Sequence, residues 1–111
     1  MIKVIFGFNR RPGMSRQEFR DYRQNVHAPL LFAIPEAEKI RRFAISYAQP
    51  TPTAPEPRFD AIVEAWFDSL ADMDAFYLSD NFRTQVAPDH ANFIDLSSGM
   101  KLVTEEIVDV D

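Results

Sequence analysis

The segment IKVIFGFNRRPGMSRQEF, residues 2–19, joins an alternating apolar pattern to a helix start, and it decides how the fold begins. Residues 1–9 predict a strand, because side chains two positions apart share one face of a strand. One predicted face carries Ile2, Val4, Phe6 and Phe8, and the other carries Lys3, Ile5, Gly7 and Asn9. The sequence Arg-Arg-Pro-Gly at 10–13 predicts the turn that follows.

The first predicted helix has a complete start signal. Ser15 is a good N-cap residue, and Glu18, three residues later, completes a capping box. Met14 and Phe19 occupy the two positions of a hydrophobic staple. A helix therefore begins directly after Ser15.

The apolar positions of this helix predict which side is buried. The expected stripe, at helical spacing, consists of Phe19, Tyr22, Val26 and Leu30. Proline disfavours α geometry in the residue before it, so Pro29 predicts a kink or break close to His27. Pro35 marks the end of the segment that follows.

The middle of the chain predicts two strands separated by a loop. Residues 40–49 are rich in Ile, Phe and Tyr, and residues 60–68 alternate between Ile62, Glu64 and Trp66 on one face and small or apolar residues on the other. Between them, residues 50–57 contain four prolines and predict an exposed loop.

The last third of the chain predicts a second helix and a final strand. Ser69 with Asp72 opens the helix. Its apolar positions are Leu70, Met73, Phe76 and Tyr77. A shorter helical piece is expected at 81–86, ended by Pro88, and then a loop at 89–98 anchored by Phe93 and Ile94. Gly99 is expected to turn the chain into a strand at 100–108.

The order of elements is therefore β-α-β-β-α-β, which defines an α+β fold of the ferredoxin-like kind. In this fold, two helices cover one face of a four-stranded antiparallel sheet. The length of 111 residues is suited to a single domain over 1–111.

The first three predicted strands carry large apolar residues on both faces. The pattern shows Ile5 opposite Val4 and Phe6, Ile45 and Tyr47 near Ala44, and Trp66 beside Val63 and Phe67. A sheet with helices on one face normally presents polar residues on the other. We therefore expect a homodimer, a dimeric α+β barrel, in which a partner covers the second face and the pairing encloses a chamber.

Composition narrows the classes of function. The absence of cysteine excludes disulfides and thiolate chemistry, and three glycines leave no phosphate-binding loop for a nucleotide, flavin or nicotinamide cofactor. Basic residues are scattered in a chain of net charge −5, which argues against nucleic-acid binding. No apolar run is long enough for a membrane span and no signal peptide is recognisable, so we expect a cytoplasmic protein.

Several motifs, taken in order, resemble the EthD family. The helix FRDYRQNVHAP at 19–29 is similar to the family's aromatic-rich helix that ends in His-Ala-Pro, and RPGMS at 11–15 is similar to the turn before it. The segments at 59–70 and 89–95 resemble the family's third strand and its acidic, aromatic closing loop. Two positions depart from the pattern: Arg23 replaces an aromatic residue, and His90 replaces an acidic one.

The resemblance implies a dimeric α+β barrel related to muconolactone-type isomerases and small cofactor-free oxygenases. It suggests an oxidoreductase that needs no organic cofactor. The alternatives are an isomerase or lyase of the muconolactone-isomerase kind, or a non-catalytic dimer that binds a small molecule or assists another enzyme.

His27 is the leading candidate for a catalytic residue. Its imidazole exchanges a proton near neutral pH, and it lies at the predicted end of a helix, where it could face a cavity. The alternative is a histidine that caps helix carbonyls or fills a polar corner of the core. The family resemblance favours the catalytic role.

Asp89, His90 and Asp95 form a second candidate group, because a carboxylate beside an imidazole fixes its tautomer and stabilises its charged form. If the closing loop folds over the barrel, Asp89 can reach His27 or His90. A turn or cap residue is the alternative for Asp89 and the better reading of Asp95, while His90 fits the rim of a pocket. Two histidines outside any short ligand motif do not indicate a metal site.

The remaining candidates are expected to line an apolar pocket for a small aromatic or lactone-like ligand. They are Phe6, Tyr22, Arg23, Trp66 and Phe93. Aromatic residues at such spacing are usually core residues. Tyr22 is the strongest of them, because a buried hydroxyl needs a partner.

Overall fold

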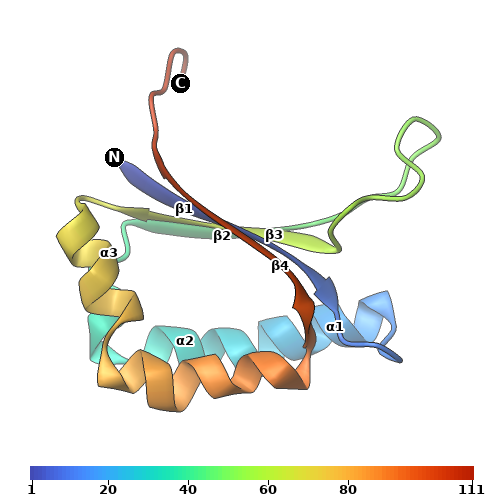
Figure 1. The fold of residues 1–111 in the computed structure, drawn as a ribbon, viewed down its shortest axis with the longest axis horizontal. Helices are drawn as coiled ribbons and strands as arrows, with labels where there is room; N and C mark the ends of the chain where they lie inside the picture. Colours follow the sequence, from blue (N-terminus) through green and yellow to red (C-terminus); the bar gives the residue numbers. More distant parts are fainter.

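The structure, a computed structural model, describes all residues from 1 to 111. A twisted four-stranded sheet lies on one side, and all helical segments lie below one of its faces (Figure 1). The strands are β1 (Ile2–Arg10), β2 (Arg42–Tyr47), β3 (Ala61–Phe67) and β4 (Ile94–Glu105). The α-helices are α1 (Arg16–Tyr22), α2 (Ala28–Ala33) and α3 (Leu70–Tyr77). Shorter helical segments are η1 (Arg23–His27), η2 (Pro35–Lys39), η3 (Phe82–Val86) and η4 (Ala87–Asn92).

The strand order β2-β3-β1-β4, with every neighbouring pair antiparallel, confirms the ferredoxin-like fold. The two strands that follow a helix, β2 and β4, lie at the edges, and β1 and β3 lie in the centre. No helix is long and apolar enough to cross a bilayer.

The last strand is longer than the sequence predicts. Instead of a loop at 89–98, the chain forms η4 and enters β4 at Ile94, so Gly99 lies within the strand and does not start it. Pro88 does not end the helical segment, because it occupies the first turn of η4, where a missing N–H breaks no helical hydrogen bond. The pairing of β1 with β4 shifts between Gly7 and Asn9, and this irregularity hid the strand from a period-two pattern.

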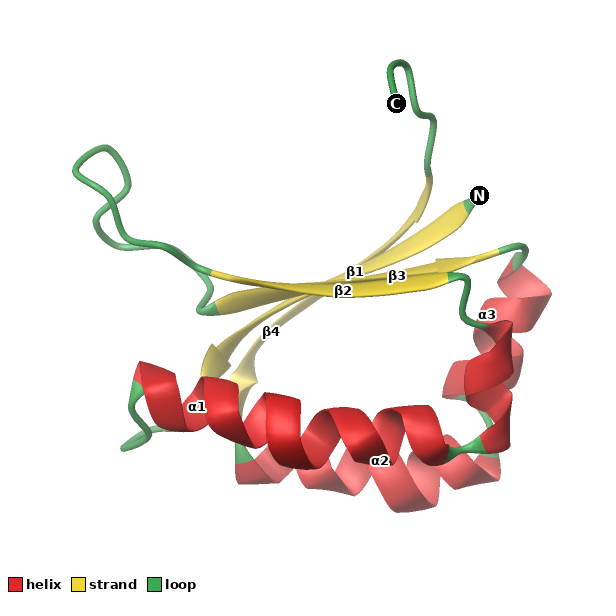
Figure 2. Ribbon diagram, turned by 180° about the vertical axis from the view of Figure 1, so that it is seen from behind, coloured by secondary structure: helices red, strands yellow, loops and turns green.

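The first helix does not break before Pro29. α1, η1 and α2 follow one another as a single helical rod beneath the sheet (Figure 2). The middle segment, η1, is a π-helical turn, in which the N–H of Ala28 donates to the carbonyl of Arg23, five residues back. A wide turn of this kind removes the usual four-residue bonds that proline would disrupt, so the rod continues through Pro29.

The wide turn changes which side chains are buried. The expected stripe holds for Phe19 and the partly buried Tyr22 but is wrong beyond them, because Val26 and Leu30 are 42% and 38% exposed. The residues that face the sheet are instead Phe19, Arg23, His27 and Leu31. They are four apart, because the π-helical turn adds a residue to the repeat.

The core divides into two clusters between sheet and helices. One surrounds Val4, Phe67 and Phe76, and the other surrounds Phe8, Phe19 and Phe93. In α3, Met73 and Phe76 are buried as expected, but Leu70, in the first turn, is 53% exposed.

The second face of the sheet is only partly apolar. Ile45 and Tyr47 pair with Val63 and Ala61 and therefore face the helices, which corrects their expected place on the far side. The far face carries Ile5, Ile62, Trp66, Met100 and Leu102, together with charged and small residues. Lys3 forms two ion pairs on this face, because its Nζ lies 2.8 and 2.9 Å from the carboxylates of Glu64 and Glu106.

The capping box of α1 provides a test of how this rod is stabilised. The N–H of Glu18 donates to Ser15 Oγ at 3.1 Å, and the N–H of Ser15 donates to Glu18 Oε1 at 3.0 Å. Ser15→Ala should lower the free energy of unfolding by about 1 kcal/mol, because one backbone N–H loses its partner. Urea denaturation measures this, with Ser46→Ala as a control, because Ser46 is exposed on β2 and its hydroxyl makes no side-chain hydrogen bond. A loss no larger than that of the control would contradict the role of the cap.

Candidate active site

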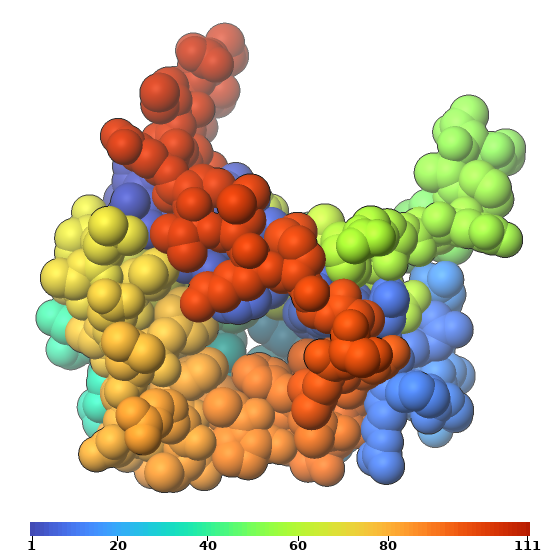
Figure 3. All heavy atoms as spheres, viewed as in Figure 1, coloured from blue at the N-terminus to red at the C-terminus, as the bar shows by residue number.

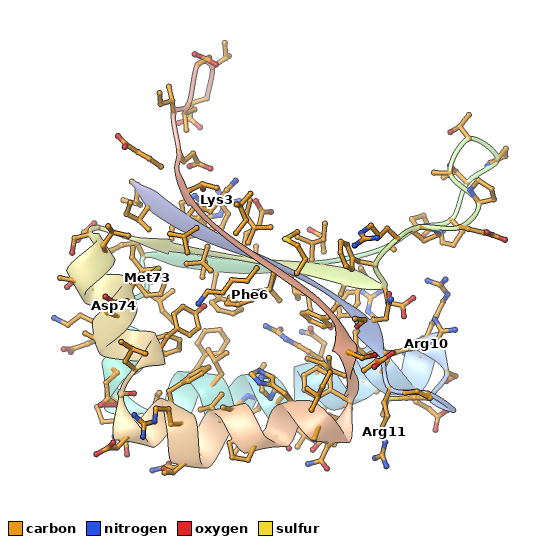
Figure 4. All side chains as sticks on the ribbon, in the orientation of Figure 1. Lys3, Phe6, Arg10, Arg11, Met73 and Asp74 are labelled. Atoms are coloured by element: carbon orange, nitrogen blue, oxygen red, sulfur yellow. The ribbon has the colours of Figure 1, made fainter.

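A cavity of about 480 Å³ lies between the helix-facing side of the sheet and the helical layer. Figure 3 shows a hollow beneath β4, above the helical segments that precede this strand. Most lining residues are apolar, and Phe6 points from the sheet into this space, while Lys3 lies beyond the sheet (Figure 4). The polar side chains on the wall are Arg23, His27, His90, Asp95 and Lys101. A few polar groups in an apolar cavity of this size are typical of small-molecule sites.

His27 is held at the cavity wall by the π-helical turn and is 3% exposed. Its Nδ1 lies 3.0 Å from Oδ2 of Asp89 on η4. An ionised carboxylate only accepts hydrogen bonds, so Nδ1 carries the proton and donates it to Asp89. The other ring nitrogen, Nε2, is then left with a free lone pair.

Asp89 is fixed by three donors. Besides His27, the hydroxyl of Tyr22 donates to Oδ1 at 2.5 Å, and the side-chain amide of Asn92 donates to the same oxygen at 2.9 Å. Burial opposes the ionised form of Asp89, but these three hydrogen bonds together outweigh it and hold its pKa below the ordinary value. The carboxylate is thus ionised at neutral pH, and it orients the imidazole.

The environment of His27 keeps its imidazole neutral. Burial lowers the pKa of His27, and the nearby charge of Arg23 acts in the same direction. The hydrogen bond and charge of Asp89 oppose this shift without reversing it. A neutral imidazole of fixed tautomer, backed by a carboxylate, is the arrangement of a general base.

His90 lies beside His27 as a second imidazole. The two ring centres are 4.7 Å apart, and the ring of Phe93 lies at the same distance from His27 and 6.3 Å from His90, so the three rings form one cluster. Burial, together with the proximity of His27, lowers the pKa of His90 to about 4, so its ring is neutral at pH 7. Two adjacent neutral imidazoles avoid the repulsion that two charged rings would suffer.

Six of the eight predicted site residues meet at or beside the cavity: Phe6, Arg23, His27, Asp89, His90 and Phe93. Tyr22 does not line it. Its ring stacks on Phe93 with 5.4 Å between the ring centres, and its hydroxyl donates a hydrogen bond to Asp89. Trp66 is also misplaced by the prediction, because it pairs with Lys3 and Arg42 on the far face of the sheet, where its indole N–H donates to Glu106.

Other wall residues were not singled out from the sequence. Phe43, Tyr77, Phe82 and Lys101 line the cavity from four different elements. Phe43 follows from the alternation of β2, but the face of Lys101 could not be derived, because the start of β4 was misplaced. Asp95 accepts from the N–H and hydroxyl of Ser97, which agrees with its interpretation as a turn residue.

The side chains show no cluster of three or more His, Cys, Asp or Glu arranged to hold a metal ion. His27 and His90 are close, but the Nδ1 of His27 is directed at Asp89. The cavity wall also lacks a glycine-rich loop at a helix start, the feature that usually cradles phosphate groups.

Fold and site together define a small α+β protein whose sheet and helices enclose an apolar cavity with a histidine–carboxylate pair at its wall. The chain belongs to the EthD family: residues 11–97 match the model of the EthD domain. Among curated proteins, it is 29% identical over 110 residues to a dehydratase (ustZ) of Ustilaginoidea virens, covering 89% of this chain and 78% of the relative. It is 31% identical over 100 residues to the conidial pigment biosynthesis dehydratase EthD of Metarhizium robertsii, covering 79% and 70%.

Solved structures agree on the fold. An EthD family protein of Bacillus halodurans superimposes with a TM-score of 0.75 at 22% identity, covering 96% of this chain and 99% of that one. An EthD-like protein of Ralstonia eutropha superimposes with a TM-score of 0.76 at 18% identity, covering 98% and 94%.

The buried imidazoles predict how stability depends on pH. The pKa of His90 is about 4 in the folded protein, below its ordinary value of 6.5, so the unfolded chain binds more protons between these pH values. The free energy of unfolding should therefore fall as the pH decreases from about 6.5 towards 4. His27, whose pKa is also lowered, contributes in the same direction.

Denaturant unfolding at pH 7.5 and pH 5 measures this loss, and His90→Gln should lose less stability between the two than the unmodified protein. Asp89 does not interfere, because the three hydrogen bonds to it lower its pKa and so move its titration further from this pH range. Equal losses in both proteins would rule out His90 as a source of the pH dependence.

Proposed function

We propose that this protein is a dehydratase that removes water from a small aromatic or hydroaromatic substrate, with His27 as the general base. The observation that carries the proposal is the pair formed by His27 and Asp89 at 3.0 Å, which leaves Nε2 as a free base on the wall of an apolar cavity. The names of the relatives in Ustilaginoidea virens and Metarhizium robertsii support dehydration as the reaction.

The proposed reaction is an elimination. Nε2 of His27 takes a proton from the carbon next to a carbonyl group, and the electrons of that C–H bond form a C=C bond. The C–O bond to a hydroxyl group on the next carbon breaks, and the leaving hydroxide takes the proton back from His27 as water. Asp89 stabilises the imidazolium formed between these two steps.

We propose elimination in place of the oxidoreductase activity that the family resemblance suggests. Both reactions can begin with the same proton transfer, so the histidine–carboxylate pair serves either. The difference lies in the relatives, which are named as dehydratases. Dehydration is also redox-neutral, so it needs neither an oxidant nor a reductant, and the compound that loses water is the only substrate.

The cavity lies within one chain, between its own sheet and helices, so a partner is not needed to form its walls. We nevertheless propose a homodimer that covers the far face of the sheet, where Ile62 and Leu102 are 37% and 52% exposed. Structures of similar fold from Bacteroides fragilis and Thermobifida fusca are described as dimeric, which supports this assembly.

His27 is tested by activity on a hydroxytetralone, a bicyclic β-hydroxy ketone whose dehydration gives a naphthol that absorbs in the near ultraviolet. His27→Asn should reduce kcat/KM by roughly 100-fold or more, because the general base is lost. Asp89→Asn should reduce it by roughly 10- to 100-fold, because the imidazole loses its orientation and its stabilising charge.

Asp74→Asn, an exposed carboxylate on α3, is the matched control and should leave the rate unchanged. Melting curves show whether each variant is folded. Binding of the compound by a folded protein that never turns it over would contradict the proposal and favour the binding module instead. If His27→Asn retained the activity, His27 could not be the general base.

The dimer is tested by placing a charge on the far face of the sheet. Leu102→Lys should shift the sedimentation coefficient from that of a dimer to that of a monomer at micromolar concentration, because a buried unpaired charge is costly at an interface. Leu70→Lys, an equally exposed leucine on α3, should leave the dimer intact. A monomer already present in the unmodified protein would refute this assembly.

A further inference from the structure

Arg23 carries a positive charge into the cavity wall without a carboxylate to balance it. Arg23 is 5% exposed, and its side chain makes one hydrogen bond, in which Nη1 donates to the amide oxygen of Gln24 at 3.1 Å. Its guanidinium carbon lies 5.6 Å from the ring centre of Phe43, and none of the ion pairs in the structure includes Arg23. Four of its five N–H donors are therefore free of side-chain acceptors.

The unbonded nitrogens of this guanidinium are not sealed in the core, because the only fully buried side-chain atom without a partner is the hydroxyl oxygen of Tyr77, so they remain accessible from the cavity. Burial lowers the pKa of Arg23, but arginine remains protonated at neutral pH, so the charge persists. Charged side chains with little exposure are normally paired, because removing a charge from water is unfavourable. A leucine or methionine at this position would pack on Phe43 without that cost.

The other groups of the cavity do not supply the missing anion. Asp89 is already engaged by His27, Tyr22 and Asn92, and Asp95 by Ser97. The two imidazoles are neutral.

The opposite wall adds a second unpaired cation. Lys101 on β4 lines the same cavity, and its Nζ lies 5.7 Å from the ring centres of both Phe6 and Tyr77, with no carboxylate within ion-pair distance. Arg23 and Lys101 thus place two cations without an ion-pair partner on a wall rich in aromatic rings, which also carries Asp95.

We propose that Arg23 is the recognition residue for a negatively charged oxygen on an aromatic or hydroaromatic substrate, and that Lys101 assists it from the opposite wall. The oxygen belongs to a carboxylate or to an ionised enol or phenol. This inference names the substrate class for the proposed dehydratase and rests on that proposal.

The spacing along the helical rod supports this assignment. Arg23 and His27 are the first and last residues of the π-helical turn, and both are buried on its inner side. A planar substrate bound to Arg23 through an anionic oxygen therefore lies in the same cavity as the free nitrogen of His27. A cation here also favours the enolate that forms when a proton is removed beside a carbonyl.

Calorimetric titration at pH 7.5 tests the inference with three naphthalene probes of equal ring size. They are 2-naphthoate, 2-naphthol and the neutral 2-naphthalenemethanol. The protein should bind one of the two acidic probes roughly 10- to 100-fold more tightly than the neutral alcohol, the range expected for a charge-assisted hydrogen bond. Preference for naphthoate identifies a carboxylate, and a long-wavelength naphtholate band on binding naphthol identifies an ionised phenol.

Arg23→Gln should remove this preference while leaving the affinity for the alcohol within about twofold, since only the charge contact is lost. Arg20→Gln is the matched control. Arg20 is exposed, lies one turn earlier on the same helix and contacts Tyr47 away from the cavity, so its loss should change neither affinity.

A structural role for Arg23 is separated by stability. Arg23→Met should melt at or above the temperature of the unmodified protein, because an unpaired buried charge is replaced by an apolar chain. A lower melting temperature with equal losses for acidic and neutral probes would overturn the inference. Equal binding of all three probes, or binding of none at millimolar concentration, would overturn it as well.

The test does not depend on turnover. If the protein binds acidic probes selectively but does not dehydrate the hydroxytetralone, the anion site is supported and the proposed dehydratase activity is contradicted. If the protein dehydrates that neutral ketone but shows no preference for acidic probes, the dehydratase activity is supported and the anion site is contradicted.

Discussion

The π-helical turn at Arg23–His27 is the feature on which the site depends. It places an arginine and a histidine on the inner side of a helix whose regular continuation would have buried Val26 and Leu30. It also allows the helix to run through Pro29, so that a long rod lies below the whole sheet. Wide turns of this kind often occur at functional sites, because the irregular hydrogen bonding places a side chain where a regular α-helix could not.

The electrostatics of the cavity follow from burial more than from the number of charges. Both histidines are kept neutral by removal from water, while the one carboxylate close to them stays ionised because three donors hold it. Two neutral imidazoles thus lie beside an ionised carboxylate, while Arg23 and Lys101 lie elsewhere on the wall without an ion-pair partner.

The two faces of the sheet differ in role because side chains alternate along each strand. On β1, Phe6 reaches the cavity while Lys3 forms ion pairs on the opposite face. On β3, Val63 lines the cavity and Trp66 lies on the far face. A single register thus supplies both the wall of the cavity and the surface proposed for the dimer.

The features that the amino-acid order alone determines are local. The capping box at Ser15, the alternation of β1 and β3 and the helix start at Ser69 depend on neighbours within a few residues, so the ferredoxin-like order follows from the residues themselves. His27 could be named as a site candidate from the chemistry of its imidazole and from the family resemblance. The pairing of His27 with Asp89 could be anticipated only as one possibility, because sixty-two positions separate them.

Three features required tertiary packing. The buried stripe, the continuation through Pro29 and the early start of β4 each depend on a departure from regular geometry, either a widened helical turn or a shifted strand register. A pattern of period 3.6 or 2 assumes regular geometry and therefore misassigns every residue beyond such a point. Tyr22 and Trp66 were misplaced for a related reason: the side to which an aromatic ring points is decided by the layer that packs against it.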